Sequence, residues 1–390
     1  MTAVTKQIDN PIAHLTPEDV EAIGVELDAI RQEVIDTRGE RDAAYIRRVI
    51  DIHHKLELAS RAVLLASKYP PAWILGTAGL AVAKILENME IGHNILHGQW
   101  DWMRDPKINS SSWEWDHPSP AETWKYSHNE IHHKYTNIVG QDNDLGYGIM
   151  RVDEDQPWTP RSLTQPLQNF LTMLVFEYGI AAYDMEFGEN IKLPKEQRDP
   201  EFAGRLKRTL KKIGRQVRKD YLVHPLLSGP SFKSTLTANL VANVVRNIWS
   251  HSVIICGHFP EGVATFEQEA VDPNESRGQW YLRQMLGSAN ISGSPVMHVM
   301  TGNLSHQIEH HIFPDLPSNR YAEIAPKVKA LFEKYDLNYH SAPLPQQVVS
   351  AWHKVIRLSF PNGWLEATNR KNLIPQLRLL ARMAKGAQPA

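Results

Sequence analysis

The sequence predicts an all-α fold, and three observations support this expectation. Apolar residues recur at helical spacing near the N-terminus, over 16–50. Three further stretches, 56–92, 168–187 and 235–258, hold apolar runs of helical rather than strand length. Runs that alternate apolar and polar residues, which are typical of strands, are scarce. We therefore expect helices throughout and few strands.

The N-terminal region carries a helix-start signal. Thr16 can cap a helix, and Pro17 suits its first turn. Glu18 and Asp19 would offset the positive end of the helix dipole. One apolar face follows, made of Val20, Ile23, Leu27, Ile30 and Val34. Dense charges between these positions favour a cytosolic setting rather than lipid, so we assign 1–50 to an amphipathic helical segment of its own.

Each of the three apolar stretches is interrupted. Pro70 and Pro71 divide the first into two halves. Glu177 and Asp184 lie within the second, and Arg246 lies within the third. No stretch offers 18 uninterrupted apolar residues, and the mean hydropathy of the chain is −0.39. Hydropathy alone therefore slightly favours the buried helices of a soluble bundle over membrane spans.

The segment 205–219 is strongly basic, with eight Lys or Arg and no acid. One apolar stripe runs along it, made of Leu206, Leu210, Ile213 and Val217. This combination suits a helix on an anionic membrane surface or beside the phosphates of a ligand. A solvated charged face packed on the protein explains it equally well.

The last part of the chain is again helical in pattern. A proline-punctuated loop over 313–320 precedes a helix, and a basic helical pattern follows over 364–386. We assign 51–330 to the main domain and 331–390 to a C-terminal helical cytosolic segment.

Composition excludes several classes of protein. A net charge of −2 and an isoelectric point near 6.8 give no argument for nucleic-acid binding. The single cysteine, Cys256, excludes a disulfide within the chain and a self-contained cysteine-ligated iron–sulfur cluster. Any iron–sulfur electron source must then be another protein. The start of the chain, MTAVTKQIDN, has no apolar core, so we expect no secretion signal.

Nine of the 18 histidines fall into three short clusters and one isolated position. They are His93, His97, His128, His132, His133, His258, His306, His310 and His311. Positions four apart lie about 40° apart around an α-helix, so such a pair can point two imidazoles at one centre. Adjacent histidines diverge by about 100°, which suits them to two neighbouring metals. The spacing therefore predicts a binuclear metal site.

Ligand number and type narrow the chemistry. A catalytic zinc site needs three protein ligands and an open position, so eight or nine histidines are too many for one. The first cluster reads HNILH, which lacks the glutamate of the HExxH zinc motif. The Glu-x-x-His pattern of soluble ferritin-like di-iron proteins is also not evident.

The flanks of the clusters resemble a known family. The first box is HNILH, the second is HNEIHH with its continuation KYTNIVGQDNDLGYG, and the third is HQIEHHIFPDLP. Similar segments also surround the isolated histidine, in TANLVANVVRNIWSHSVIICGHFP. The chain resembles, over most of 50–330, the integral-membrane histidine-box fatty acid desaturases, and most closely the acyl-CoA (stearoyl-CoA-type) desaturases of actinobacteria.

The resemblance implies a fold, a reaction and partners. It implies a membrane-embedded helical bundle, multi-pass in a bacterial cell membrane, with a helical cytosolic cap that holds two irons. The implied reaction uses O2 to insert a cis double bond into a long acyl-CoA chain, with Δ9 on a stearoyl-type chain favoured. The expected partners are membrane lipid, the acyl-CoA substrate and a separate reductase or ferredoxin-like protein that passes on electrons from NAD(P)H. No fused haem domain is expected, because His117-Pro118 and His224-Pro225 lack the glycines of an HPGG motif.

Carried over by position, the nine histidines are the expected iron ligands, and no catalytic residue is expected apart from them. The first position of the third box is contested, because relatives with a QxxHH box place glutamine where this chain has Gln307. His306 lies one residue earlier and repeats the HxxxHH spacing, so we favour His306 as the ligand with Gln307 nearby.

Carboxylates are expected to orient the metal-bound imidazoles. The candidates are Glu90, Glu130, Asp142, Asp144 and Glu309. Four tryptophans after the first box are candidates to line the acyl or coenzyme A path, although aromatic packing explains them as well. They are Trp100, Trp102, Trp113 and Trp115.

Alternatives remain open at this stage. A front-end (linoleoyl-CoA-type) desaturase and an alkane or lipid hydroxylase fit the same histidines. A histidine-rich membrane metal-binding or transport protein is a candidate of a different class. Transport predicts ionisable residues along a path inside membrane segments, whereas the histidine clusters flank the apolar stretches, which favours a fixed cytosolic site. If 168–187 and 235–257 both spanned a membrane, the basic segment 205–219 would lie outside the cell, against the preference of Lys and Arg for the cytosol. We expect 205–219 on the cytosolic side.

Overall fold

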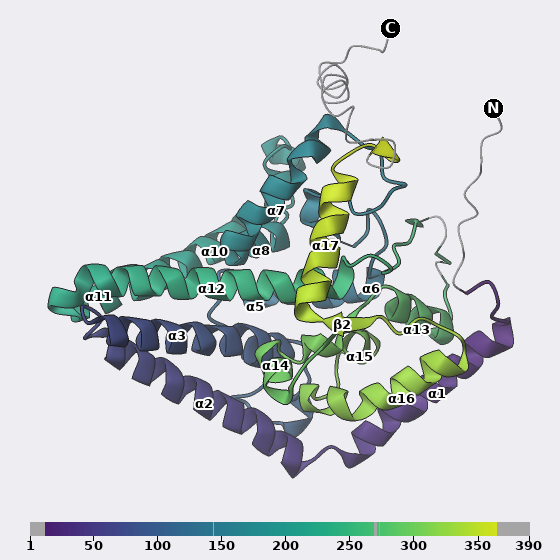
Figure 1. The fold of residues 1–390 in the computed structure, drawn as a ribbon, viewed down its shortest axis with the longest axis horizontal. Helices are drawn as coiled ribbons and strands as arrows, with labels where there is room; N and C mark the ends of the chain where they lie inside the picture. The colour runs from purple at the N-terminus through teal and green to yellow at the C-terminus, as the bar shows by residue number, and fades with distance from the viewer. Residues whose placement is uncertain (1–11, 143, 269–270, 273, 365–390) are drawn as a thin grey trace, which may run out of the picture.

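The computed structural model describes residues 12–142, 144–268, 271–272 and 274–364 (Figure 1). Helices dominate this part of the chain, and the expected all-α class is confirmed. The predicted C-terminal helical pattern over 364–386 lies, beyond residue 364, outside the described residues.

Two helices rather than one follow the predicted start signal. Helix α1 spans Pro17–Thr37 and α2 spans Glu40–Leu64. The capping box at Thr16 is present, with its hydroxyl accepting from the amide of Asp19 at 3.1 Å. The chain turns between the two helices. Helix α1 lies beside α16 (Tyr321–Lys334), and α2 runs away from them toward the opposite end of the molecule (Figure 1).

Three long helices form the frame that carries the site. Helix α2 packs along α3 (Pro70–Leu86), and α3 packs along α12 (Phe232–His258). The expected break at Pro70 and Pro71 is confirmed, since these prolines open α3. Helix α12 has 27 residues and so extends for about 40 Å. The short helix α11 (His224–Leu227) meets the start of α12 at the end far from the cap (Figure 1).

The stretch 168–187 is divided. Helix α7 covers Gln165–Leu174 and α8 covers Phe176–Asp184. The side chain of Asn247 accepts from the amide of Glu177 at 3.3 Å and donates to the carbonyl of Leu174 at 3.0 Å. Because one buried amide satisfies both freed backbone groups, the chain can break where its apolar pattern is continuous.

The basic segment forms a helix, α10 (Phe202–Val217), preceded by the short helix α9 (Phe187–Asn190). Its Lys212 donates to the carbonyls of Trp115 and Ser119, both at 3.1 Å. One face of the basic helix therefore packs on the protein. The opposite face exposes Lys207, Lys211, Arg215 and Arg218 together with Leu210 and Val217.

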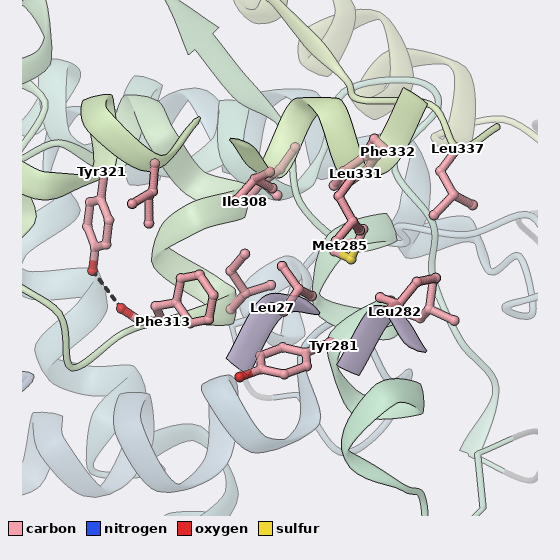
Figure 2. Packing of buried hydrophobic residues seen from close by; sticks show 14 of the residues in the cluster. Leu27, Tyr281, Leu282, Met285, Ile308, Phe313, Tyr321, Leu331, Phe332 and Leu337 are labelled. Atoms are coloured by element: carbon pink, nitrogen blue, oxygen red, sulfur yellow. Dashed lines mark hydrogen bonds between the residues drawn. The ribbon is translucent and has the colours of Figure 1, made fainter. Parts of the chain in front are cut away.

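The cap is built around a separate apolar core (Figure 2). Helices α1, α13 (Arg277–Leu286) and α16 (Tyr321–Lys334) enclose it, and the third histidine box lies on α15 (Gln307–Ile312) within it. Ile308 within the box and Phe313 after it are fully buried there. The hydroxyl of Tyr321 donates to the carbonyl of Phe313 at 3.0 Å, which fixes the end of the box (Figure 2).

The remaining elements close the cap against α12. Strands β1 (Asn290–Ser292) and β2 (Ser341–Pro343) pair in parallel, with Asn290 opposite Ser341. Helix α17 (Leu344–Leu358) follows β2 and packs on α12, and α14 (Pro295–Met300) follows β1. Short helices α4 (Asn94–Leu96), α5 (Ala121–Lys125) and α6 (His133–Tyr135) flank the first two boxes.

The family resemblance implied membrane-spanning helices. Among the described helices, none combines enough length with enough apolar character to cross a membrane.

Candidate metal centre

A π-helical segment leads into the first histidine box and ends at His93, and another carries His128 and His132 of the second box. Segment Glu87–His93 continues α3 as a π-helix, and Tyr126–His132 continues α5 in the same way. The histidine spacing was interpreted with α-helical geometry, and the structure instead has π-helical geometry in these two segments. A Cβ atom at Gly92 would lie 3.0 Å from Trp115, so the close contact between this segment and Trp115 needs glycine. Wider helical turns of this kind recur at functional sites.

Four histidines converge into a first group. They are His93, His97, His128 and His310, and their nearest ring nitrogens all lie within 4.8 Å of one another. The rings of His97 and His310 are 4.7 Å apart, and those of His93 and His97 are 4.6 Å apart. Three segments distant in sequence thus supply one set of ligand atoms.

Three histidines form a second group under the same distance limit. They are His132, His258 and His311. The rings of His258 and His311 are 4.6 Å apart. The isolated His258 is the last residue of α12, so the long helix delivers it directly to the cap.

His133 lies between the two groups. Its ring is 4.6 Å from that of His97 and stacks at 4.4 Å on that of His311. Both of its ring nitrogens are buried without a hydrogen-bond partner among the described residues. The structure therefore brings together eight of the nine predicted histidines in two adjoining groups.

The outer nitrogens of these rings are held by neighbours, as expected for metal ligands. The Nδ1 atom of His311 is 3.1 Å from the side-chain oxygen of Gln284, and that of His258 donates to the carbonyl of Gly287 at 3.1 Å. The Nδ1 atom of His310 lies 3.3 Å from the hydroxyl of Tyr321. Each ring is thus turned so that its Nε2 faces its group.

Most of the inner nitrogens lack protein partners. In the described part of the chain, buried Nε2 atoms with no partner belong to His97, His128, His133, His310 and His311 of the groups and to His306 outside them. Burial lowers the pKa of His93 to about 4 and holds that of His97 well below its usual range, so both are neutral at physiological pH. Neutral imidazoles with free, converging nitrogens are the donor set that a transition metal needs. These residues fit two metal ions.

Two of the predicted carboxylates reach the histidines. Asp142 accepts from Nδ1 of His132 at 2.9 Å, and Asp144 accepts from Nδ1 of His128 at 3.0 Å. Burial opposes protonation of His132, but Asp142 and Asp144 outweigh it and raise its pKa to about 9. The carboxylates thereby fix the ring orientations and increase the basicity of the ligands.

The other three predicted carboxylates do not touch the eight clustered histidines. Glu90 is buried and accepts from Tyr45, Asn303 and Ser318. Glu309 is buried and accepts from Asn290 and Tyr339. Glu130 is exposed. Glu90 and Glu309 therefore bind side chains of neighbouring segments rather than the rings themselves.

His306 and Gln307, the two candidates for the first position of the third box, lie in different places. His306 lies outside both groups, with its ring 4.5 Å from that of His298. Gln307 instead points at the second group, and its amide nitrogen lies 3.0 Å from Nε2 of His258. Gly257 makes room for it, because a Cβ atom there would lie 2.9 Å from the Gln307 side chain.

A mostly apolar cavity adjoins the histidines. Met89, Phe176, Ile180, Ile254 and Leu304 are among its apolar lining residues. His93, His128, His132 and His258 line it too. Along α12 the lining runs from His258 to Asn247, a helical distance of about 16 Å.

The predicted tryptophans divide between cavity and core. Trp115 lines the cavity, whereas Trp100 is fully buried in a separate core cluster against which Trp102 and Trp113 pack. Trp124 and Gln284 were not predicted. The ring of Trp124 stacks on His128 at 4.5 Å and lines the cavity, and a local signal existed, because Trp124 lies four residues before His128 on one helical stretch. Gln284 has no local signal, because it reaches His311 only through the tertiary fold.

Comparisons with known proteins agree with this geometry. A family model described as fatty acid desaturase matches residues 69–343. An NADPH-dependent stearoyl-CoA 9-desaturase of Mycobacterium tuberculosis is 49% identical over 358 residues, covering 90% of this chain and 83% of the relative. An sn-1 linoleoyl-lipid 6-desaturase of Synechocystis is 23% identical, over 79% of this chain and 84% of the relative. A delta(5) fatty acid desaturase of Dictyostelium discoideum is 23% identical, over 67% of this chain and 58% of the relative.

Proposed function

Because the chain belongs to the fatty acid desaturase family, we propose that it is an O2-dependent acyl-CoA desaturase with a histidine-ligated di-iron centre. A stearoyl-type chain is the favoured substrate and Δ9 the favoured position of the double bond. The mycobacterial relative is named a stearoyl-CoA 9-desaturase, and it is 49% identical to this chain. The observation that carries the proposal is the set of eight clustered histidines beside an apolar cavity, five of which have a buried ring nitrogen without a partner in the described part of the chain.

The proposed iron ligands are the eight clustered histidines. The first group would hold one iron and the second group the other, with His133 between them. Gln307 is the ninth candidate, because it faces His258 while His306 does not. Bound iron would supply the activation of O2 needed to remove hydrogen from an unactivated methylene pair.

The ninth position can be tested with a matched pair of variants. Gln307→Ala and His306→Ala change neighbouring residues of the same box, and iron per folded protein is measured in each. Loss of iron in the Gln307 variant alone supports Gln307. Loss in the His306 variant alone would restore the expectation from HxxxHH spacing.

The protein's own part in the reaction is to position the chain and exclude water. Ile180 and Ile254 give the cavity apolar walls, and Trp124 closes its histidine end by stacking on His128. An acyl chain bound along α12 would present a methylene pair to the first box. A dry, fixed site protects the oxidised centre from side reactions.

Membrane attachment is part of the proposal. Large apolar side chains are exposed on α2, α3, α11 and α12, toward the end of the molecule far from the cap (Figure 1). They are Leu58, Ile74, Leu75, Leu226, Leu227, Leu240, Val241 and Val245. A patch of this size on one end fits contact with lipid. The cap with its metal centre would then face the cytoplasm of a bacterial cell.

The side on which the basic helix lies can be tested by labelling. Cys256 is buried, so a cysteine at exposed Gly214 of α10 provides a site for an impermeant thiol reagent. Absence of labelling in intact cells, with labelling after lysis, supports the cytosolic side. Labelling from outside the cell would contradict it.

The electrons must come from elsewhere, since the single cysteine gives the chain no cysteine-ligated cluster of its own. We propose a separate reductase or ferredoxin-like protein fed by NADPH, the reductant named for the mycobacterial relative.

Expression in a desaturase-deficient host, followed by analysis of the fatty acids, tests the function as a whole. A new cis double bond at C9 of stearoyl chains is expected. A double bond nearer the carboxyl end would instead indicate a front-end enzyme. Hydroxylated chains without a new alkene would overturn the proposal in favour of a hydroxylase.

A further inference from the structure

Three successive residues in the loop after the second box adopt left-handed backbone. The φ angles of Gly146, Tyr147 and Gly148 are 74°, 51° and 63°. Glycine adopts this conformation freely, but a bulky tyrosine does so only at a cost in free energy. Gly146 also makes room for Val152, since a Cβ atom at Gly146 would lie 2.8 Å from that side chain. The loop is therefore built to hold one strained tyrosine in a fixed place.

That place is the wall of the cavity beside the histidines. Tyr147 lines the cavity together with Asp144 and His132. Its ring stacks at 6.4 Å on Phe259, the residue after His258, and lies 6.0 Å from Phe176. Asp144 on the same loop accepts from His128. One loop thus positions both a metal-orienting carboxylate and the phenol.

The hydroxyl of Tyr147 has no hydrogen-bond partner among the residues that the structure describes. The residue is only 9% exposed, so bulk water is not available to the hydroxyl either. An unsatisfied buried hydroxyl adds a second cost to the strained backbone. Two costs at one residue indicate that a partner enters the cavity during function.

The chemistry of the proposed reaction narrows that partner. The methylenes of an acyl chain offer no acceptor for a hydroxyl. A small oxygen-containing or anionic ligand at the metal centre does, and it would enter the same cavity. Asp144 and Asp142 raise the pKa of Tyr147 further above the value set by burial, so the phenol stays protonated and can donate.

We propose that Tyr147 donates a hydrogen bond to the small ligand that the metal centre binds on its cavity side, and so helps to position O2 for the reaction. The inference rests on the proposed di-iron function and adds a residue outside the histidine boxes to it. Its strain is part of the device, because the loop prevents the phenol from turning to a protein partner.

The test is azide binding to the iron-loaded protein, followed by the visible absorption of the complex. Tyr147→Phe removes only the hydroxyl and should raise the azide Kd by about 10-fold. Iron content should stay equal to that of the wild type. The Tm should stay the same or rise, because the variant no longer buries an unpaired hydroxyl.

Tyr183→Phe is the matched control. Its hydroxyl is also buried without a described partner, and its ring lies 5.8 Å from that of Tyr147, yet it does not line the cavity. Azide affinity should be unchanged in this variant. Equal shifts in both variants, or no shift in Tyr147→Phe at equal iron content, would overturn the inference. A lower Tm with unchanged azide affinity would assign the hydroxyl to folding and overturn it as well.

Failure of the proposed function gives a different result. Iron-loaded wild type that binds no azide would overturn the inference together with the proposed open metal centre. Wild type that binds azide, with no effect of the Tyr147 variant, would overturn the inference alone.

Discussion

Two regions of this molecule bury many polar groups, and they treat them in opposite ways. At the far end, Asp220 is fully buried and accepts from Arg61 at 2.9 Å and from Lys84 at 2.7 Å. Asn239 and Asn243 donate to the same residue. At the metal centre, by contrast, Nε2 atoms converge and remain without partners among the described residues.

The difference separates structural polarity from functional polarity. Buried charges that satisfy one another, as around Asp220, hold α2, α3 and α12 together and need no ligand. Buried nitrogens that converge and stay free require a ligand. The sequence contains polar interruptions in both regions, and only the partners distinguish them.

The substitution with the largest expected effect is at the metal centre. His310→Ala removes a ligand of the first group and should abolish desaturation, with loss of at least half of the bound iron. The metal-free protein should remain folded, and its free energy of unfolding should fall only by the cost of the cavity and of the lost contact between Nδ1 of His310 and the Tyr321 hydroxyl. Iron analysis beside denaturant unfolding checks both. A metal-free variant that is strongly destabilised would show that His310 is structural.

The next effect belongs to the far end. Asp220→Ala leaves Arg61 and Lys84 buried without their shared anion and should lower the free energy of unfolding by about 3–5 kcal/mol. The fraction that folds should bind iron normally. Denaturant midpoints and iron per folded protein are the measurements. Loss of iron without loss of stability would show that the network around Asp220 supports metal binding and is not only structural.

Chelation sharpens the same contrast. Removing iron should lower the free energy of unfolding by about 2.7 kcal/mol when the free metal stands at 100 times its Kd. Thermal unfolding with and without chelator, at fixed protein concentration, gives the shift in Tm. The Asp220 variant should show the same shift, because its network does not touch the metal. Identical melting of loaded and chelated wild type would contradict the ligand role of the free nitrogens.

The smallest effect is expected at an orienting carboxylate. Asp142→Asn keeps the shape but removes the charge that faces Nδ1 of His132, and should weaken metal affinity by about 10- to 100-fold. Asp155→Asn, on an exposed part of the following loop, is the control and should have no effect. Competition with a metal indicator measures both. Equal metal affinities in the two variants would show that Asp142 does not support metal binding.

The sequence predicted much of this site because its signals are local. Histidine spacing marks the boxes, and the GQDND continuation marked Asp142 and Asp144 before any fold was known. The proline break at α3 and the cap of α1 are local signals as well, and the structure confirms both helix starts.

What could not be predicted depends on tertiary contacts. Spacing favoured His306 over Gln307, yet Gln307 faces His258 because Gly257 on α12 leaves room for it. Gln284 carries no motif and reaches the ring of His311 only after distant elements pack. The break at Val175 is equally invisible in the apolar pattern, because the amide that stabilises it comes from Asn247.

The π-helical turns have a consequence for anyone who wishes to transplant this site. A π-helix is an α-helix that has accepted one surplus residue, so one such residue precedes the first box and another falls in the segment that carries the second. Deleting one residue between 87 and 93 would restore regular hydrogen bonding and turn everything downstream by about 100° relative to α3. A designer who copies only HNILH onto an ideal helical bundle would therefore aim both imidazoles away from the metals. The portable unit is the box together with its surplus residue.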